Sequence, residues 1–256
     1  MTEYLTSQHP QLTLGESVAI GYDSTARPVR IAGYNSSITG ANRETVWSTG
    51  GAYAFAAAAD DPEIDSSSAQ DAAAGSGAKT VRIEYLDTSF NLLSKTMAPV
   101  GTTDTTTALP TFFRLNGLTV MTGAVAAGVV QVRSAADTPV YGAIELGQYK
   151  SRDAVYTVPL GKKLLVQKLT VTSNAATAAK SYGLFTVMAN YDQYTQAKQT
   201  FDVSQFVLPC NAGGETMDLA PICYPAGVDI HIDVIGNAVT DAAEVTAELI
   251  GLLLPA

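Results

Sequence analysis

The stretch SSSAQDAAAGSGAKTVRIEYLD, residues 66–87, joins two unlike halves. The first half is small, polar and punctuated by glycine, so it cannot build a hydrophobic core and predicts a surface loop. In the second half the side chains alternate, with Val81, Ile83 and Tyr85 on one face and Arg82 and Glu84 on the other. This period of two predicts a half-buried β-strand over residues 80–87. A long loop of small residues before such a strand indicates a segment that is packed by another surface, a second chain being one candidate.

Outside this stretch, short apolar runs are separated by Gly, Pro, Asn, Asp and Ser, which is typical of an all-β protein. Further strands are predicted at residues 14–20, 29–34, 92–97, 111–120, 129–133, 154–158, 163–171, 182–190, 200–207, 228–235 and 244–253. Helical composition is confined to residues 52–60, which favour either a short helix or the end of a strand. The pattern predicts an all-β fold: an antiparallel β-sandwich, jelly-roll-like, with two β-subdomains.

Three segments of the second half carry more specific expectations. Residues 228–235 alternate sharply, so Ile230, Ile232 and Val234 are expected to face inward and Asp229, His231 and Asp233 outward. Residues 182–191 are apolar on both faces, which predicts a central strand covered on both sides. Residues 247–254 are nearly all apolar and predict a C-terminal strand inserted in a sheet. The turns at residues 158–161 and 224–227 carry Pro second and Gly fourth, as type I turns do.

The chain is expected to divide into two domains. Residues 1–152 are predicted to form an N-terminal β-rich domain with an extended N-terminal arm, and residues 153–256 a C-terminal β-sandwich that is jelly-roll-like. Lys150-Ser151-Arg152-Asp153 is the best boundary, because strands become regularly spaced just after it. A chain of 256 residues is long enough for two modest domains.

The chain has few charged residues, and the acidic ones outnumber the basic ones. Charged residues make up 15% of the chain, against about 25% in soluble domains, so much of the surface must be covered by Thr, Ser, Gln, Asn, Gly and Ala. Such a surface is common where neighbours bury it in an assembly, and also in secreted β-domains. The net charge of −9, with Lys and Arg scattered, argues against nucleic acid and anionic membranes as partners.

The termini and cysteines indicate the compartment. The N-terminus has no basic region followed by an apolar core, so no signal peptide is predicted, and no apolar run approaches the length that spans a bilayer. We therefore expect a soluble chain made in a cytoplasm. Cys210 and Cys223 are spaced so that a disulfide is sterically feasible, but reduced thiols are favoured and zinc is disfavoured.

No catalytic constellation stands out. His231 lies between Asp229 and Asp233, an arrangement that can hold a metal but more often forms a solvated strand face. No Gly-x-Ser-x-Gly elbow occurs, and Gly75-Ser76-Gly77 precedes a strand and lacks the Lys-Ser/Thr ending of a phosphate loop. Asp71 alone is weak support for calcium. The chain is predicted to have no catalytic, cofactor-binding or metal-binding residues, hence not to be an enzyme.

Two segments resemble one family. Residues 66–87 are similar to a segment of tailed-bacteriophage virion proteins, notably marine and freshwater ones, that reads Ser-Ser-Ser-x-x-Asp-x-x-x-Gly-x-Gly-Ala-x-x-Val-x-Ile-x-x-Leu-Asp. The matching residues are Ser66, Ser67, Ser68, Asp71, Gly75, Gly77, Ala78, Val81, Ile83, Leu86 and Asp87. Residues 156–162, YTVPLGK, resemble a Tyr-Thr-Val-Pro-x-Gly-Lys segment of the same proteins.

The resemblance implies a virion structural protein, assembled into the particle in the host cytoplasm. The favoured role is capsid decoration, as a cement or head-fibre-base protein that docks on the major capsid protein or other virion proteins, as a homotrimer. Alternatives are a tail, adaptor or baseplate component and a glycan-binding host-attachment module. Clustered tyrosines keep the glycan alternative open, although core and interface filling is the favoured interpretation of these rings. The interface candidates are Ser67, Asp71, Gly75, Gly77, Tyr191 and Tyr194.

Overall fold

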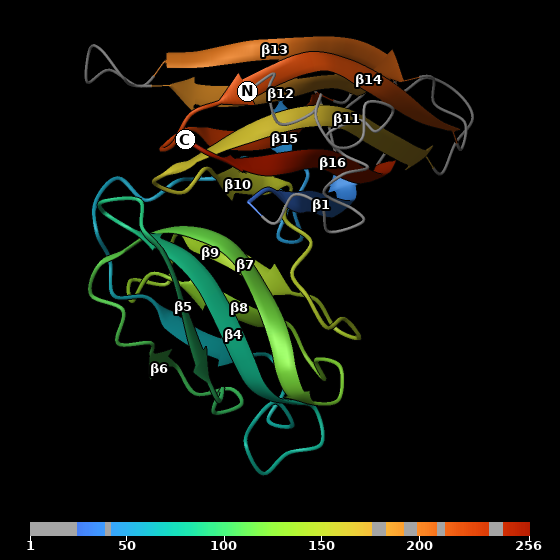
Figure 1. Ribbon diagram of the computed structural model, residues 1–256. Helices are drawn as coiled ribbons and strands as arrows, with labels where there is room; N and C mark the ends of the chain where they lie inside the picture. Colours follow the sequence, from blue (N-terminus) through green and yellow to red (C-terminus); the bar gives the residue numbers. More distant parts are fainter. Residues whose placement is uncertain (1–24, 39–41, 176–182, 192–198, 209–212, 236–242) are drawn as a thin grey trace.

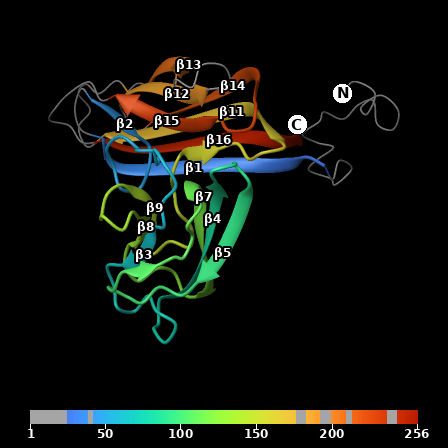
Figure 2. The same cartoon turned by 90° about the vertical axis from the view of Figure 1, so that its left-hand side faces the viewer.

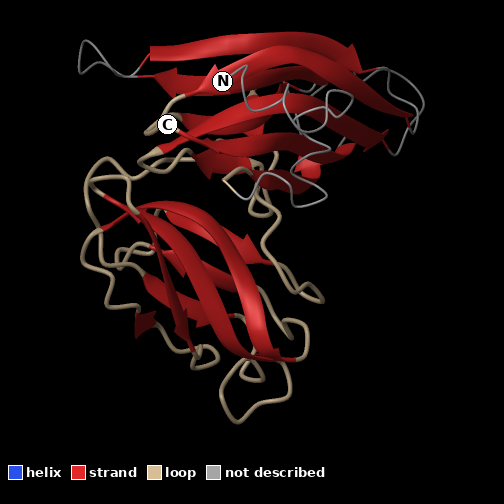
Figure 3. Ribbon diagram, in the orientation of Figure 1, coloured by secondary structure: helices blue, strands red, loops and turns tan. Residues whose placement is uncertain are grey.

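The computed structural model describes residues 25–38, 42–175, 183–191, 199–208, 213–235 and 243–256, with side chains described for 25–38, 42–174, 223–234 and 244–256. This part of the chain is all-β and contains no helix (Figure 3). Its strands are β1 (Arg27–Ile38), β2 (Arg43–Thr45), β3 (Glu63–Ser66), β4 (Ala78–Asp87), β5 (Leu92–Met97), β6 (Thr105–Thr106), β7 (Phe112–Gly123), β8 (Val130–Arg133), β9 (Val140–Ile144), β10 (Val155–Thr157), β11 (Lys162–Ala175), β12 (Gly183–Tyr191), β13 (Gln199–Leu208), β14 (Gly213–Tyr224), β15 (Asp229–Ile235) and β16 (Ala243–Pro255).

The larger of two modules contains two antiparallel sheets, with strand orders β1-β16-β11-β14 and β10-β15-β12-β13. The short strand β2 joins the second sheet through β15. We call this the discontinuous module, because β1 and β2 precede the other module in the chain and β10–β16 follow it. The two sheets pack around a common core to which each contributes alternate residues, among them Leu164, Val166, Leu249, Ile230 and Ile232. The predicted β-sandwich is therefore present.

The smaller module, which we call the inserted module, spans residues 60–150. Its two sheets have the orders β6-β3-β8-β9 and β5-β4-β7. The face of β4 predicted to be buried is buried: Val81 and Ile83 are fully enclosed, and they pack with Phe112, Leu118 and Ile64 in a second core. Each module thus has its own hydrophobic core, and β1 lies on the side of the discontinuous module that faces the inserted one (Figures 1 and 2).

The sheets do not follow the predicted boundary between residues 152 and 153. Strands β1 and β2 lie before that boundary, yet β1 pairs with β16 and β2 with β15. The physical reason is that strand pairing joins segments far apart in the chain, which local composition does not register. The predicted N-terminal arm and the strand at residues 14–20 lie outside the described residues.

Two smaller expectations are corrected. Residues 52–60 form irregular backbone that ends in a single bridge from Asp60 to Phe112, so the helix alternative is wrong. The first proline turn is closed by a hydrogen bond from the Lys162 amide to the Pro159 carbonyl, 3.1 Å long. Gly161 therefore stands third in that turn, where its φ of 72° suits glycine. The predicted C-terminal strand is confirmed, since β16 lies between β1 and β11.

Candidate functional site

The loop that precedes β4 is folded onto its own chain around Asp71. The Asp71 carboxylate is fully buried and accepts hydrogen bonds from the amides of Ala78 (2.7 Å), Ala127 (2.8 Å) and Gly128 (2.9 Å). The Ser66 hydroxyl donates a fourth, 2.6 Å long. Four donors satisfy the carboxylate, so Asp71 ties the loop to the segment before β8 rather than holding a cation.

Small residues are required because backbones approach closely here. A Cβ at Gly77 would lie 2.2 Å from the Asp71 carboxylate, and one at Gly75 would lie 2.0 Å from the Gln70 carbonyl. Both distances are shorter than any real Cβ contact, so only glycine fits. The surface that packs the loop therefore includes other segments of the same chain.

The interface candidates occupy different places. Asp71 and Gly77 are buried by their own chain, and they shape the loop without offering a surface to a partner. Gly75 is half-buried, whereas Ser67 is exposed and its hydroxyl accepts a hydrogen bond from the Val129 amide. The Tyr191 side chain and all of Tyr194 lie outside the described residues.

A buried ion pair joins the two modules. The Arg114 guanidinium on β7 donates to both carboxylate oxygens of Asp229 on β15, at 2.9 and 3.0 Å. Each residue is 3% exposed, so water screens the pair little. The guanidinium also donates to the Ala56 carbonyl and lies over the Phe113 ring. This contact fixes β7 against β15.

A second set of contacts lies beside it. Asn116 donates to the Thr157 carbonyl and accepts from the Thr157 amide, both at 2.9 Å, which adds a strand-like link between β7 and β10. The Thr157 hydroxyl donates to Asp229 at 2.6 Å, so the two sets share a carboxylate. The modules are therefore held by paired polar groups in a defined register.

The face of β15 that was predicted to be solvated is buried instead. Asp229 and Asp233 are each 3% exposed, and the Thr45 hydroxyl donates to Asp233 at 2.8 Å. The His231 imidazole lies between them beside the Phe55 ring, and burial lowers its pKa. The prediction is wrong because Arg114 and Phe55, which come from distant segments, cover this face. Ile230, Ile232 and Val234 face the core as predicted.

Asp153 is the other perturbed acid at the junction. Its Oδ1 accepts hydrogen bonds from the Ser48 amide and hydroxyl, and its Oδ2 lies against Gly142. Burial raises the pKa of Asp153 to about 6, although the hydrogen bonds from Ser48 favour the charged form. A part of the Asp153 population is therefore protonated in mildly acidic solution.

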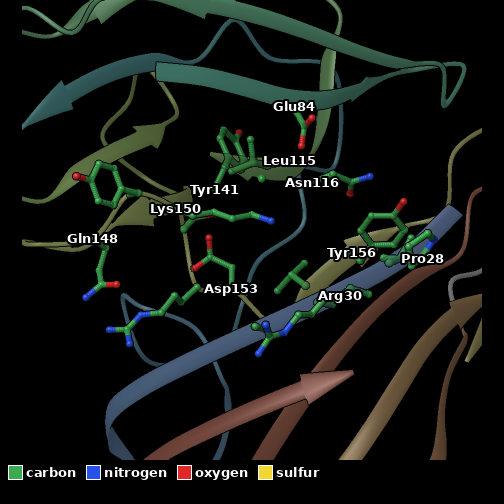
Figure 4. A pocket seen from close by; sticks show the side chains of 18 residues that line it. Pro28, Arg30, Glu84, Leu115, Asn116, Tyr141, Gln148, Lys150, Asp153 and Tyr156 are labelled. Carbon is green, nitrogen blue, oxygen red and sulfur yellow. The ribbon is translucent and has the colours of Figure 1, made fainter. Parts of the chain in front are cut away.

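A cleft of about 600 Å³ opens between the modules next to Asp153. One wall is β1, through residues 28–32, and the other consists of residues 115–117 of β7 and the segment 148–153. Figure 4 shows Lys150 near the middle, with Gln148 to one side and Asn116 and Tyr156 to the other. This cleft is the candidate binding site of the chain.

The described residues offer little for covalent or metal chemistry. No group of three or more His, Cys, Asp or Glu side chains within them is placed to hold a metal. Cys223 is free and exposed, and Cys210 lies outside the described residues. No helix in the described part is long and apolar enough to cross a membrane. The arrangement is suited to binding, through polar groups on rigid walls.

Sequence reasoning missed the junction residues, although part of the signal was visible. Arg114 and Asn116 interrupt the apolar strand FFRLNGLTV, and a charge in an apolar run needs a buried partner. The identity of that partner was not accessible, because Asp229 lies 115 residues further along the chain.

The chain matches no protein-family model, and a search of curated proteins finds no significant match. The functional argument therefore rests on the residues and the contacts described above.

Proposed function

We propose that this chain is a structural component of a tailed-bacteriophage virion, with capsid decoration as its role. In this proposal it self-associates as a homotrimer, docks on the major capsid protein and stabilises the capsid by burying surface between subunits. Standard protein interfaces bury about 1,600 Å². Several such interfaces in each trimer can stabilise the assembly without a cofactor.

The observation that carries the proposal is the role of the residues shared with virion proteins. Asp71 organises the loop before β4, and Gly75 and Gly77 give it room. Asp87 accepts hydrogen bonds from the amides of Ser89 and Asn91 in the next turn. In the second segment the backbone of Thr157 links the modules through its two hydrogen bonds with Asn116. These residues have structural roles, which is the kind of role that the virion proposal gives them.

The strand order gives further support. Counted in chain order without β2, the eight strands of the discontinuous module form sheets 1-8-3-6 and 2-7-4-5. We infer that this module is a jelly roll, an arrangement of two Greek keys that recurs in viral capsid and lectin domains. The fold hosts other functions too, so this is support by analogy.

The outer face of the sheet β5-β4-β7 is suited to docking. Thr96 and Thr119 lie opposite Arg82 across the strands, and Thr80 lies opposite Thr122, with their hydroxyls 2.7 Å apart. Arg82 pairs with the neighbouring Glu84, which also lines the cleft between the modules. The free energy needed to desolvate a face of short hydroxyl side chains is small, because few charged groups lose their hydration.

The test is the presence and copy number of the protein in purified virions. An antibody against the recombinant chain is used for immunogold electron microscopy, and isotope-dilution mass spectrometry counts copies per particle. We expect label on heads and a copy number in the hundreds, as symmetric decoration of a capsid requires. Absence from purified virions would overturn the virion proposal.

A copy number of about a dozen with label at the neck or tail would contradict decoration and assign the adaptor or tail role, whose rings contain few subunits. The oligomeric state is measured by light scattering on the recombinant protein. A trimer supports the proposed assembly, and a monomer that persists at high concentration contradicts it.

A further inference from the structure

The cleft between the modules has walls that are fixed before any ligand arrives. Two contacts hold β7 in place beside the cleft. Arg114 binds Asp229 on β15, and Asn116 binds Thr157 on β10. Sites between rigid modules bind with less loss of conformational freedom, because the binding groups are already in place. A volume of about 600 Å³ lies within the range of about 300–1,000 Å³ that is typical of small-molecule sites.

The cleft presents polar groups that the protein itself does not use. Among the described residues, no hydrogen bond or ion pair engages the side chains of Gln148, Lys150 or Tyr156, and all three line the cleft. Gln148 can donate and accept, Lys150 donates and the Tyr156 hydroxyl does both. Burial, followed by the charge of Glu84, raises the pKa of Tyr156 to about 12, which keeps that hydroxyl protonated at neutral pH.

The charges in the cleft nearly balance. Arg30, Lys150 and Arg152 line it with Glu84 and Asp153, and two of the three cations already have partners outside the lining: Arg30 pairs with Glu248 and Arg152 with Glu145. A strongly charged ligand, such as a nucleic acid or a polyphosphate, gains little from such a balance. A lipid chain would leave the polar groups without partners.

The remaining surface of the cleft suits a ring with hydroxyl groups. Tyr149 lines the cleft and is 58% exposed, so its ring is accessible to a ligand. Gly117 and Ala32 leave room between the walls, and a Cβ at Gly117 would meet nothing closer than 3.8 Å. Aromatic faces cover the C–H surface of sugars, while amide, ammonium and phenol groups bind their hydroxyls.

We propose that this cleft binds a short oligosaccharide, with Gln148, Lys150 and Tyr156 contacting its hydroxyl groups and Tyr149 covering one ring face. The contacts proposed here do not use the clustered tyrosines near residue 194, which lie outside the described residues. It does not depend on the virion role, because a decoration protein and a protein of another kind can each carry it.

The probe is an array of defined neutral and acidic oligosaccharides, followed by calorimetric titration of the strongest ligand. We expect wild-type protein to bind at least one neutral oligosaccharide. The Gln148→Ala/Lys150→Ala double variant should weaken that binding about tenfold or more, which corresponds to about 1.4 kcal/mol. Gly117→Tyr should abolish it by filling the cleft, without removing any polar group.

The matched control is Lys79→Ala, which removes an exposed lysine outside the cleft and should leave the affinity unchanged. Circular dichroism and thermal melting establish that each variant is folded. Two results contradict the proposal: no oligosaccharide on the array binds the wild-type protein, or both cleft variants bind the strongest ligand as tightly as Lys79→Ala does. Neither result bears on the copy number in virions, so the two proposals fail separately.

Discussion

A single buried carboxylate organises the loop before β4. Asp71 is fully buried and accepts hydrogen bonds from three backbone amides and one hydroxyl. The loop has few apolar side chains of its own, so these hydrogen bonds help to fix its path together with backbone bonds such as Gly77 to Gln70. The residue therefore explains why a glycine-rich segment is ordered.

Asp71→Ala should destabilise the protein severely. The change leaves the amides of Ala78, Ala127 and Gly128 buried without acceptors, and at about 1–3 kcal/mol for each lost partner the total exceeds about 3 kcal/mol. Urea unfolding measures the free energy change. The control Ser67→Ala removes one exposed hydrogen bond and should cost about 1 kcal/mol or less; equal losses for the two variants would refute the role of Asp71.

Asp153 should make stability depend on pH in the direction opposite to an ordinary carboxylate. Its pKa rises from 3.8 to about 6 on folding, so the folded state binds its proton more tightly. The stability from this group is complete below about pH 4 and is lost as pH rises through about 6, by about 3 kcal/mol in total.

Asp153→Asn should remove that loss, because an amide does not ionise, while its oxygen still accepts from Ser48. The variant is expected to be more stable than the wild-type protein at pH 8 and nearly equal at pH 4. Urea unfolding at several pH values, followed by the fluorescence of Trp47, the single tryptophan, measures the difference. The stability difference between the variant and the wild-type protein should be larger at pH 8 than at pH 4. If it is the same at both pH values, the raised pKa of Asp153 is contradicted.

At the scale of strands, β16 holds the larger module together. It pairs with β1 on one side and β11 on the other, and its Leu249 is fully buried between the sheets. Any loss of packing along β16 therefore affects both neighbouring strands and the opposite sheet.

Leu249→Ala should destabilise the protein by about 2–5 kcal/mol, because it removes a buried side chain and leaves a cavity. Leu160→Ala, which truncates a leucine that is 57% exposed in the turn before β11, should change stability by less than about 0.5 kcal/mol. Denaturant unfolding of both variants tests this. A small effect at Leu249 would mean that β16 is not central to the core.

Sequence patterns predicted the strands in which polar and apolar side chains alternate over enough residues to show a period of two. β4 and β15 alternate over six residues or more, and β11 alternates on each side of an irregularity between Val166 and Lys168; the structure has all three strands where the pattern predicts. β2, β3 and β6 are four residues or shorter, too short to show a period. β14 contains Pro221, which is tolerated because β14 lies at the edge of its sheet.

Orientation of the faces was harder to predict than the strands themselves. The alternation of β15 correctly separates its two faces, but whether the face of Asp229 and Asp233 meets water depends on what packs there. Arg114 and Phe55 supply that cover from other parts of the chain. The cleft was unpredictable for the same reason, since its walls come from β1, β7 and the segment 148–153.

For the whole molecule, the ion pair between Arg114 and Asp229 couples the two modules. Removal of one partner leaves a buried charge without compensation, which costs about 3–5 kcal/mol. This loss of free energy weakens the contact between the modules, because Arg114 belongs to the inserted module and Asp229 to the discontinuous module. The cores of the modules do not depend on it.

Arg114→Met should therefore separate the unfolding of the modules. Differential scanning calorimetry is expected to show one transition for the wild-type protein and two for the variant, with the first at lower temperature. Arg82→Met is the control, because it disrupts a partly exposed pair with Glu84 that contributes about 1 kcal/mol or less. A single, unshifted transition in Arg114→Met would show that the modules are coupled by other contacts.

The path of the chain through the modules also bears on how the protein is made. A ribosome completes residues 60–150 as one continuous unit, so the inserted module can fold while translation continues. β1 is translated much earlier than its partner β16, the last strand described. It therefore stays unpaired until β16 has been synthesised. Until then its unpaired edge is open to wrong partners. We expect nascent chains to depend on chaperones during this interval, and slow translation of residues 151–255 to increase aggregation more than slow translation of the inserted module.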